Sequence, residues 1–233
     1  MRREREALGS TGRRARSDLP PPSYGVASAP DQGSDSLAAL GRALDQRPIL
    51  IALAGPNGAG KTTFYHAHLR PAGLRFLNAD EISRDLEIDA YEAARVVTEL
   101  RQELVRQRES FVLETVFSDP VGDKLNFLKA AAQAGYTVVL CFIGLSGPEM
   151  SEQRVAMRVS QGGHDVPSEK LGSRFPRTLA NLRAAIRDLP HVVIFDNDDL
   201  RVPFRRVAVM EGGRLVWLAD PPPKWLGEIK SVG

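Results

Sequence analysis

Blocks of two kinds alternate along most of this chain. Short apolar runs of strand length are followed by longer stretches in which apolar residues recur every three or four positions, as in an amphipathic helix. The apolar runs predict strands over residues 48–54, 74–80, 111–117, 137–145 and 191–197. The longer stretches predict helices over residues 36–44, 61–70, 91–110, 119–135, 146–163 and 167–190.

The order of these elements defines the fold class. Alternating strands and helices predict an α/β fold, with a mostly parallel sheet and helices on both faces. Two apolar runs around Gly212 and Gly213 predict a C-terminal β-hairpin. Asp119 and Pro120 form a helix-start signal. Pro176 predicts a break or kink in the last helix, because proline lacks the N–H that a helix interior uses.

Residues 1–36 differ from the rest of the chain. They are rich in Arg, Ser, Pro and Gly and show no hydrophobic period, which predicts a disordered N-terminal tail ahead of one domain over residues 37–233. Arginines near the N-terminus are also typical of transit peptides and nucleic-acid-binding segments. Glu4 and Glu6 are interleaved with them, and prolines follow, so a solvated tail is favoured.

Composition narrows the classes of function. The 233 residues are 42% hydrophobic, enough for a sizeable core, and the formal net charge of +2 is too small to indicate a nucleic-acid or membrane partner. No apolar stretch approaches the roughly 20 residues that span a bilayer, and no signal peptide is visible. The single cysteine, Cys141, lies in a predicted strand and fits a reducing cytoplasm.

The segment GPNGAGKTTF, residues 55–64, matches the phosphate-loop (P-loop) pattern G-x-x-x-x-G-K-[ST]. It lies between a predicted strand and a predicted helix, the context that this motif requires. Lys61 is expected to reach the β- and γ-phosphates of ATP, and the Thr62 hydroxyl is expected to bind Mg²⁺. The predicted nucleotide-binding residues here are Gly55, Pro56, Asn57, Gly58, Ala59, Gly60, Lys61, Thr62 and Thr63.

Acidic residues end three of the predicted strands, at the sheet edge where ligands bind in parallel sheets. Asp80 follows the second strand and is a candidate general base that accepts the proton of an acceptor hydroxyl. It is also a candidate N-cap, since Glu81 and Ile82 begin a helical pattern. Glu114 ends the third strand, and Asp196 reads as an ordinary loop carboxylate.

Two pairs of arginines flank the Gly-rich turn over residues 161–167. Arg154 and Arg158 share one helix face, and Arg174 and Arg177 share another. This arrangement predicts a helical lid whose guanidinium groups neutralise charge on a transferring phosphoryl group. His164, in the turn itself, is a candidate for a substrate contact or for a turn-stabilising role.

The motifs together resemble the zeta toxin family and its bacterial zeta-like relatives. The segments that carry the resemblance, spread over residues 46–228, are GPNGAGKTTF, NADEI, ETVFS, RVAMRVSQGGHDVP, RFPRTLANL, FDN and PPPKWL. The resemblance implies a P-loop kinase with an NTPase-type sheet. Zeta toxins phosphorylate the 3′-hydroxyl of the amino sugar in UDP-N-acetylglucosamine, so it also implies a nucleotide-sugar acceptor and raises an antitoxin as a candidate partner.

The resemblance assigns roles residue by residue. Lys61 corresponds to the phosphate-binding lysine and Asp80 to the catalytic base. Glu114 and Thr115 correspond to the segment that lines the substrate side. Arg158 corresponds to an arginine on the γ-phosphate, with Arg174 or Arg177 as a second. The GGHxVP turn belongs to the zeta-like relatives, whose acceptors are mostly undefined.

The sequence therefore predicts an ATP-dependent phosphotransferase with Mg²⁺ as cofactor. Three alternatives stay open. The acceptor could be a different small molecule or a polynucleotide end. The protein could instead transfer the phosphoryl group to water, as an ATPase or nucleotide-dependent switch does. A non-catalytic module that only binds ATP is the third.

Overall fold

The computed structural model describes residue 41 and residues 44–160 and 166–230. The predicted tail over residues 1–36, most of the first predicted helix and the turn that contains His164 lie outside these residues. The predictions made for them stay predictions.

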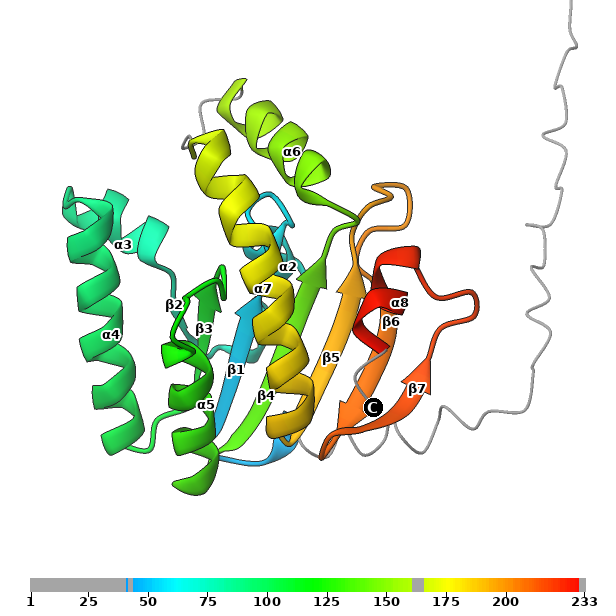
Figure 1. The fold of residues 1–233 in the computed structure, drawn as a ribbon. Coiled ribbons are helices and arrows are strands. Elements are labelled where there is room, and N and C mark those ends of the chain that lie inside the picture. Colours follow the sequence, from blue (N-terminus) through cyan, green and yellow to red (C-terminus); the bar gives the residue numbers. More distant parts are fainter. Residues whose placement is uncertain (1–40, 42–43, 161–165, 231–233) are drawn as a thin grey trace, which may run out of the picture. The chain divides into compact units, whose positions relative to one another are not determined.

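One sheet organises the described part of the chain (Figure 1). Its strands follow the order β2-β3-β1-β4-β5-β6-β7. The pairs from β2 to β5 are parallel, and β6 and β7 add an antiparallel hairpin. The strands are β1 Ile49–Ala54, β2 Arg75–Leu77, β3 Phe111–Thr115, β4 Thr137–Gly144, β5 His191–Asp196, β6 Arg205–Glu211 and β7 Arg214–Leu218. The predicted α/β class, the mostly parallel sheet and the C-terminal hairpin are thereby confirmed.

The helices follow the predicted order with some different boundaries. They are α2 Lys61–Phe64, α3 Ala79–Leu86, α4 Ala90–Arg106, α5 Asp123–Gln133, α6 Pro148–Ser160, α7 Ser168–Asp188 and α8 Lys224–Lys230. After α2 the chain continues through a π-helical turn, Tyr65–Leu69, and a 3₁₀ turn, Arg70–Ala72. Helix α8 was not predicted. Its Trp225 is buried against Gly144, where an added Cβ would lie 2.2 Å from the indole ring.

One predicted helix start was wrong, for a tertiary reason. Helix α5 begins at Asp123, after Gly122 with φ of 71°, and not at the Asp119–Pro120 signal. The Asn181 side chain of α7 donates to the carbonyls of Phe117 and Asp119, at 2.9 and 3.0 Å, and so holds that segment outside the helix. Helix α7 itself runs through Pro176 without a break.

Both faces of the sheet are covered, which explains why the inner strand β1 is apolar at every position. In β1, Leu50 and Ala52 pack in one core with residues of α4, α5, α7 and α8. Ile51 and Leu53 point to the other face and pack in a second core with Phe64 and the turn after α2. Side chains of a strand alternate between faces, so a strand buried on both sides needs no polar position.

The parallel strands end along one edge, where the functional residues gather. Figure 1 shows α6 and the first turns of α7 beyond this edge, above the start of α2. Because Lys61 begins α2 and Glu114 lies near the end of β3, the fold brings segments far apart in sequence to one place. Within the described residues, no helix is both long and apolar enough to cross a membrane.

Candidate functional site

The P-loop is built from backbone, and its lysine is buried. Lys61 is 7% exposed, and its Nζ donates to the Pro56 carbonyl at 3.0 Å. Burial lowers the pKa of the Lys61 ammonium, while the nearby carboxylates of Glu114 and Asp80 oppose that shift. The loop therefore holds an ammonium group away from water, with carboxylates next to it, where a phosphate can replace the carbonyl contact.

Asn197, at the end of β5, fixes the shape of the loop. Its side chain is 2% exposed, donates from Nδ2 to the Ala59 carbonyl at 2.8 Å and accepts from the Phe204 N–H at 3.1 Å. Gly60 has φ of 87°, and a Cβ there would lie 2.9 Å from the same amide nitrogen. Only glycine therefore fits at this position without displacing the asparagine.

Helix α6 lies directly on the P-loop. The Ser151 hydroxyl is buried and donates to the Asn57 carbonyl at 2.6 Å. A Cβ at Gly58 would come within 2.9 Å of the Ser151 carbonyl and of Arg154 Cβ. The Arg154 guanidinium donates to the backbone carbonyl of Asn197 at 2.6 Å. The base of α6 is thus part of the nucleotide site, and Arg154 serves this packing.

A second cluster joins the P-loop to β3 and α3. The Thr62 hydroxyl donates to the Glu114 carboxylate, at 2.9 Å to Oε2 and 3.2 Å to Oε1, and Asn78 Nδ2 donates to the same Oε2 at 3.0 Å. Burial raises the pKa of the Glu114 carboxyl. Lys61 and Thr62 oppose the shift, and Asp80 adds to it. This carboxylate is partly desolvated and favours a nearby cation.

Asp80 lies in the first turn of α3 and is not its N-cap. The cap is Asn78, whose Oδ1 accepts from the backbone N–H groups of Asp80 at 2.8 Å and Glu81 at 3.4 Å. The predicted strand over residues 74–80 ends at Leu77 for the same reason, since Asn78 already begins the helix. The cap alternative for Asp80 was wrong, and its carboxylate lines a cavity.

The oxygen ligands in this cluster fit Mg²⁺. The Thr62 hydroxyl and the Glu114 carboxylate are hard oxygen donors in contact with each other, and a bound cation would stabilise the ionised Glu114 carboxylate against the burial that raises its pKa. Among the described residues, no group of three or more His, Cys, Asp and Glu could hold a metal ion alone. One or two protein oxygens with phosphates and water completing the shell is the usual way in which proteins bind this ion.

Two cavities meet at the P-loop. The first, of about 470 Å³, is bounded by α3, α4, the start of α5, and residues of α6 and α7. The second, of about 340 Å³, lies between the P-loop, α6 and the segment after β5. Both are lined by Gly58, Lys61, Thr62, Glu114 and Arg158. These shared residues mark the point at which ligands in the two cavities would touch.

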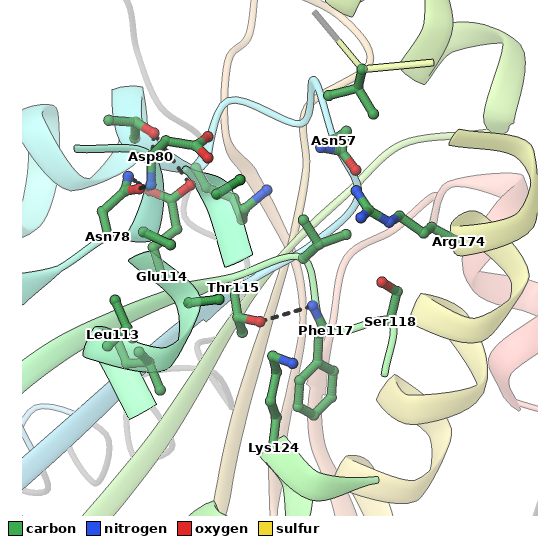
Figure 2. Close-up of a pocket in the computed structure, with 18 of the residues that line it drawn as sticks. Asn57, Asn78, Asp80, Leu113, Glu114, Thr115, Phe117, Ser118, Lys124 and Arg174 are labelled. Carbon is green, nitrogen blue, oxygen red and sulfur yellow. Dashed lines mark hydrogen bonds between the residues drawn. The ribbon is translucent and has the colours of Figure 1, made fainter. Parts of the chain in front are cut away.

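Several other predicted site residues each line only one of the two cavities. Asp80, Thr115 and Arg174 line only the first cavity. In Figure 2, Asp80, Asn78 and Glu114 group on one side, and Arg174 reaches in from α7 on another. Thr63 lines only the second cavity, together with Leu200, Pro203 and Phe204. Thr115 also accepts a hydrogen bond from the Phe117 N–H at 3.1 Å, which holds the β3 end in place.

The two members of each arginine pair have different surroundings. Arg158 lines both cavities, whereas Arg154 lines only the second, and its guanidinium donates to the backbone carbonyls of Asn197 and Asp198. Arg174 lines the first cavity, but Arg177 is exposed, lines neither, and donates to the Ser173 hydroxyl at 3.5 Å. Helical spacing places Arg174 and Arg177 on one face of α7, but only Arg174 lines the first cavity.

Sequence reasoning missed several residues of the site, and two of them are asparagines. Asn197 and Asn78 each bind a loop or a carboxylate through a buried amide. Their positions were the available signal, since each asparagine directly follows a strand, at the sheet edge where ligands bind. Asp196, read as a loop carboxylate, instead ends β5 and accepts from Trp225 Nε1 at 2.9 Å.

Several solved structures have a similar fold. A crystal structure of AvrRxo1-ORF1:AvrRxo1-ORF2 with ATP matches with a TM-score of 0.62 and 20% identity, over 85% of this chain and 69% of that one. A structure from the PezAT chromosomal toxin-antitoxin system of Streptococcus pneumoniae matches with a TM-score of 0.51 and 17% identity, over 88% and 95%. No curated protein sequence matches the chain.

These similarities agree with the resemblance drawn from the motifs. The zeta-toxin-like, P-loop kinase-type fold is confirmed. A family model described as an AAA domain (AAA_33) matches residues 50–182, which is more than half of the chain and includes the P-loop, Asp80, α6 and most of α7. The chain therefore belongs to the AAA domain family.

Proposed function

We propose that this protein is a kinase that transfers the γ-phosphoryl group of ATP to a hydroxyl of a small molecule. The observation that carries the proposal is the pair of cavities that meet at Lys61, Thr62, Glu114 and Arg158. An ATPase needs a nucleotide site and a water. A kinase needs two ligand sites that touch where the phosphoryl group moves.

The second cavity suits the nucleotide. It begins at the P-loop and ends at Leu200, Pro203 and Phe204, which are apolar side chains suited to a planar base. The P-loop backbone and Lys61 would bind the phosphates, with Arg158 at the γ-phosphate. A similar fold holds ATP in the AvrRxo1-ORF1:AvrRxo1-ORF2 structure, which supports ATP as the nucleotide.

The first cavity suits the acceptor, and Asp80 suits the base. Asp80 lines this cavity and not the second, so it would face the acceptor hydroxyl. Its carboxylate accepts the hydroxyl proton as the acceptor oxygen forms a bond to the γ-phosphorus, and the bond from that phosphorus to the β–γ bridging oxygen breaks. ADP leaves with that oxygen. Lys61, Arg158 and Arg174 stabilise the charge on the transferring group.

Thr62 and Glu114 would hold Mg²⁺. The ion, when bound, neutralises charge on the β- and γ-phosphates. The protein's own part is to keep the Thr62 hydroxyl and the Glu114 carboxylate together, which Asn78 does by its hydrogen bond to Glu114. Arg158, Arg174 and the helices α6 and α7 that carry them would form the lid.

A nucleotide sugar such as UDP-N-acetylglucosamine is the acceptor that the zeta-toxin resemblance favours. The cavity volume of about 470 Å³ accommodates a small molecule of that class. An antitoxin is a candidate partner, since the PezAT structure comes from a toxin–antitoxin system.

The test is to incubate the protein with ATP, Mg²⁺ and a panel of nucleotide sugars, and to follow products by phosphorus NMR and mass spectrometry. We expect ADP and one phosphorylated acceptor in equal amounts. Loss of ATP with only free phosphate as product would indicate an ATPase or switch. ATP binding with no turnover, unchanged in Asp80→Asn, would indicate a binding module.

A further inference from the structure

The acceptor cavity has more positive than negative side chains. Among the described residues, four cations and two carboxylates line the first cavity but not the second: Arg101, Lys124, Lys170 and Arg174, with Asp80 and Asp123. The phosphates of ATP would occupy the P-loop and so would not neutralise this excess. A ligand with negative charge of its own would do so.

Arg101 is the most unusual of these cations. It comes from α4, where residues 90, 94, 97, 98 and 101 follow helical spacing and all line the cavity. Its side chain is only 6% exposed and stacks over the Phe127 ring, with the guanidinium carbon 4.5 Å from the centroid. Its Nη2 donates to Asp123 at 2.9 Å, but its buried Nε has no hydrogen-bond partner within the described residues.

The partner of Arg101 neutralises it incompletely. The Asp123 side chain is 61% exposed, so water competes for its charge, whereas Arg101 is almost fully buried. A buried guanidinium usually binds carboxylate or phosphate oxygens through several of its N–H groups. A ligand anion in the cavity could therefore add to the Asp123 contact.

Lys124 stands next to this position, at the start of α5. Its Nζ lies 3.7 Å from Asp119 Oδ1, and its side chain is 34% exposed. Figure 2 shows Lys124 well apart from Asp80. Val97, Leu113 and Phe117 line the cavity as well and offer apolar contacts for a carbon skeleton.

We propose that Arg101 and Lys124 form an anion-binding subsite of the first cavity, which holds a phosphate-ester or carboxylate group of the acceptor while the acceptor hydroxyl lies at Asp80. That the ligand is a phosphoryl acceptor rests on the proposed kinase function, but the anion site itself can be tested without turnover. Asp123 restrains Arg101 and sets its position.

The first experiment measures the anion site directly. The full chain is saturated with Mg²⁺ and a non-hydrolysable ATP analogue, which fills the P-loop, and inorganic phosphate is titrated in by calorimetry. We expect one further phosphate to bind. Arg101→Gln and Lys124→Gln should each weaken it by roughly tenfold or more, since each removes a charge-assisted contact. The control Arg177→Gln lies outside both cavities and should change nothing.

Asp123→Asn separates a ligand site from a simple tether between α4 and α5. If Arg101 binds an anion, loss of the competing carboxylate should tighten phosphate binding. If the Arg101–Asp123 pair only joins α4 and α5, Asp123→Asn should lower the melting temperature and should not tighten phosphate binding. Absence of a further phosphate, or equal binding by Arg101→Gln and Lys124→Gln, would overturn the proposal. Lys124→Gln keeps the test valid if Arg101→Gln does not fold.

The second experiment distinguishes this inference from the kinase proposal. Acceptors are offered as matched pairs: glycerol and glycerol 3-phosphate, glucose and gluconate, N-acetylglucosamine and its UDP derivative. We expect phosphorylation of anionic members only, and the pairs separate phosphate from carboxylate. Equal turnover of neutral members would overturn the anion site and leave the kinase. A bound second phosphate with no turnover of any member would overturn the kinase and leave the anion site.

Discussion

The two cavities are built in different ways. On the side proposed for the nucleotide, the P-loop contributes its backbone, and buried side chains hold that backbone: Asn197 binds the Ala59 carbonyl and Ser151 binds the Asn57 carbonyl. On the acceptor side, side chains form the surface, and they come from α3, α4, α5 and α7. The first cavity is about 470 Å³ and the second about 340 Å³.

This difference distinguishes the P-loop backbone, which can bind the phosphates of any nucleotide, from the side chains of the first cavity, which would determine the specificity for the acceptor. Backbone N–H groups recognise phosphate by geometry, and their positions depend on a few contacts that hold the loop. Side chains such as Arg101 recognise charge and shape, and a substitution there changes the ligand without changing the loop. Substitutions on the two sides should therefore change different measured quantities.

Lys61→Ala should have the largest effect. It removes the ammonium that balances charge on the β- and γ-phosphates, so we expect phosphoryl transfer to fall by roughly 10³–10⁵, the range for a cation at a transferring phosphoryl group. ATP affinity, measured by calorimetry, should fall too. Lys170→Ala, on the acceptor side, is the control and should keep normal ATP affinity. Near-normal transfer by Lys61→Ala would mean that the P-loop is not the phosphate site.

Asp80→Asn should affect chemistry alone. We expect turnover at saturating ATP to fall by roughly 10²–10⁴, the usual contribution of general acid–base catalysis, with ATP affinity unchanged. The fold should be unaffected because the cap of α3 is Asn78.

Asn78→Ala, unlike Asp80→Asn, should lower stability, because it removes the N-cap of α3. We expect it to lower the free energy of unfolding by about 1 kcal/mol in a denaturant titration. Unchanged turnover in Asp80→Asn would exclude Asp80 as the base. Lost ATP binding in Asp80→Asn would instead indicate that the Asp80 carboxylate has a metal-binding or structural role.

Arg174→Gln and Arg177→Gln form a matched pair three residues apart on one helix. We expect Arg174→Gln to lower the rate of transfer roughly ten- to a hundredfold, because it removes a charged donor from the acceptor cavity. Arg177→Gln should leave the rate unchanged, since Arg177 is exposed and outside both cavities. Equal losses would mean that α7 rotates or shifts when ligands bind.

Asn197→Ala tests the buried contacts of the nucleotide side. It leaves the Ala59 carbonyl and the Phe204 N–H without their partner, so the free energy of unfolding should fall by about 1–3 kcal/mol. ATP affinity should fall with it, because the loop loses its support. Binding of phosphate in the acceptor cavity should be unaffected, and a loss there would contradict the separation of the two sides.

The smallest expected effect is a pH dependence from Glu114. Burial raises the pKa of its carboxyl in the folded chain above the ordinary value of 4.5, so between 4.5 and the raised value the folded state binds more protons than the unfolded state. Without Mg²⁺, stability should therefore decrease as pH rises through this window. Glu114→Gln should lack this slope, and thermal melts at several pH values measure it.

Mg²⁺ should reverse that dependence, since the ion needs the ionised carboxylate. We expect Mg²⁺·ATP to bind more weakly as pH falls through the raised pKa of Glu114. A slope in the same direction with and without Mg²⁺ would remove Glu114 from the metal site.

Much of the fold could be predicted from the sequence. Hydrophobic periodicity is local, so the apolar runs that became β1, β3, β4 and β5 were visible without any partner. The hairpin was visible from Gly212 and Gly213, which have φ of 54° and 80° and allow the tight turn. The start of α5 was not, because Asn181 of α7 holds the segment before it.

The sequence by itself determined the phosphate loop and the chemistry it can serve. One contiguous segment supplies that site through its backbone, so residues 55–64 were enough to identify it. Tertiary structure alone decided which polar side chains complete it. Asn197 lies 138 residues from the carbonyl it binds, and Asn78 lies 36 residues from Glu114. Such contacts depend on how the strands align at one edge of the sheet, which no local pattern encodes.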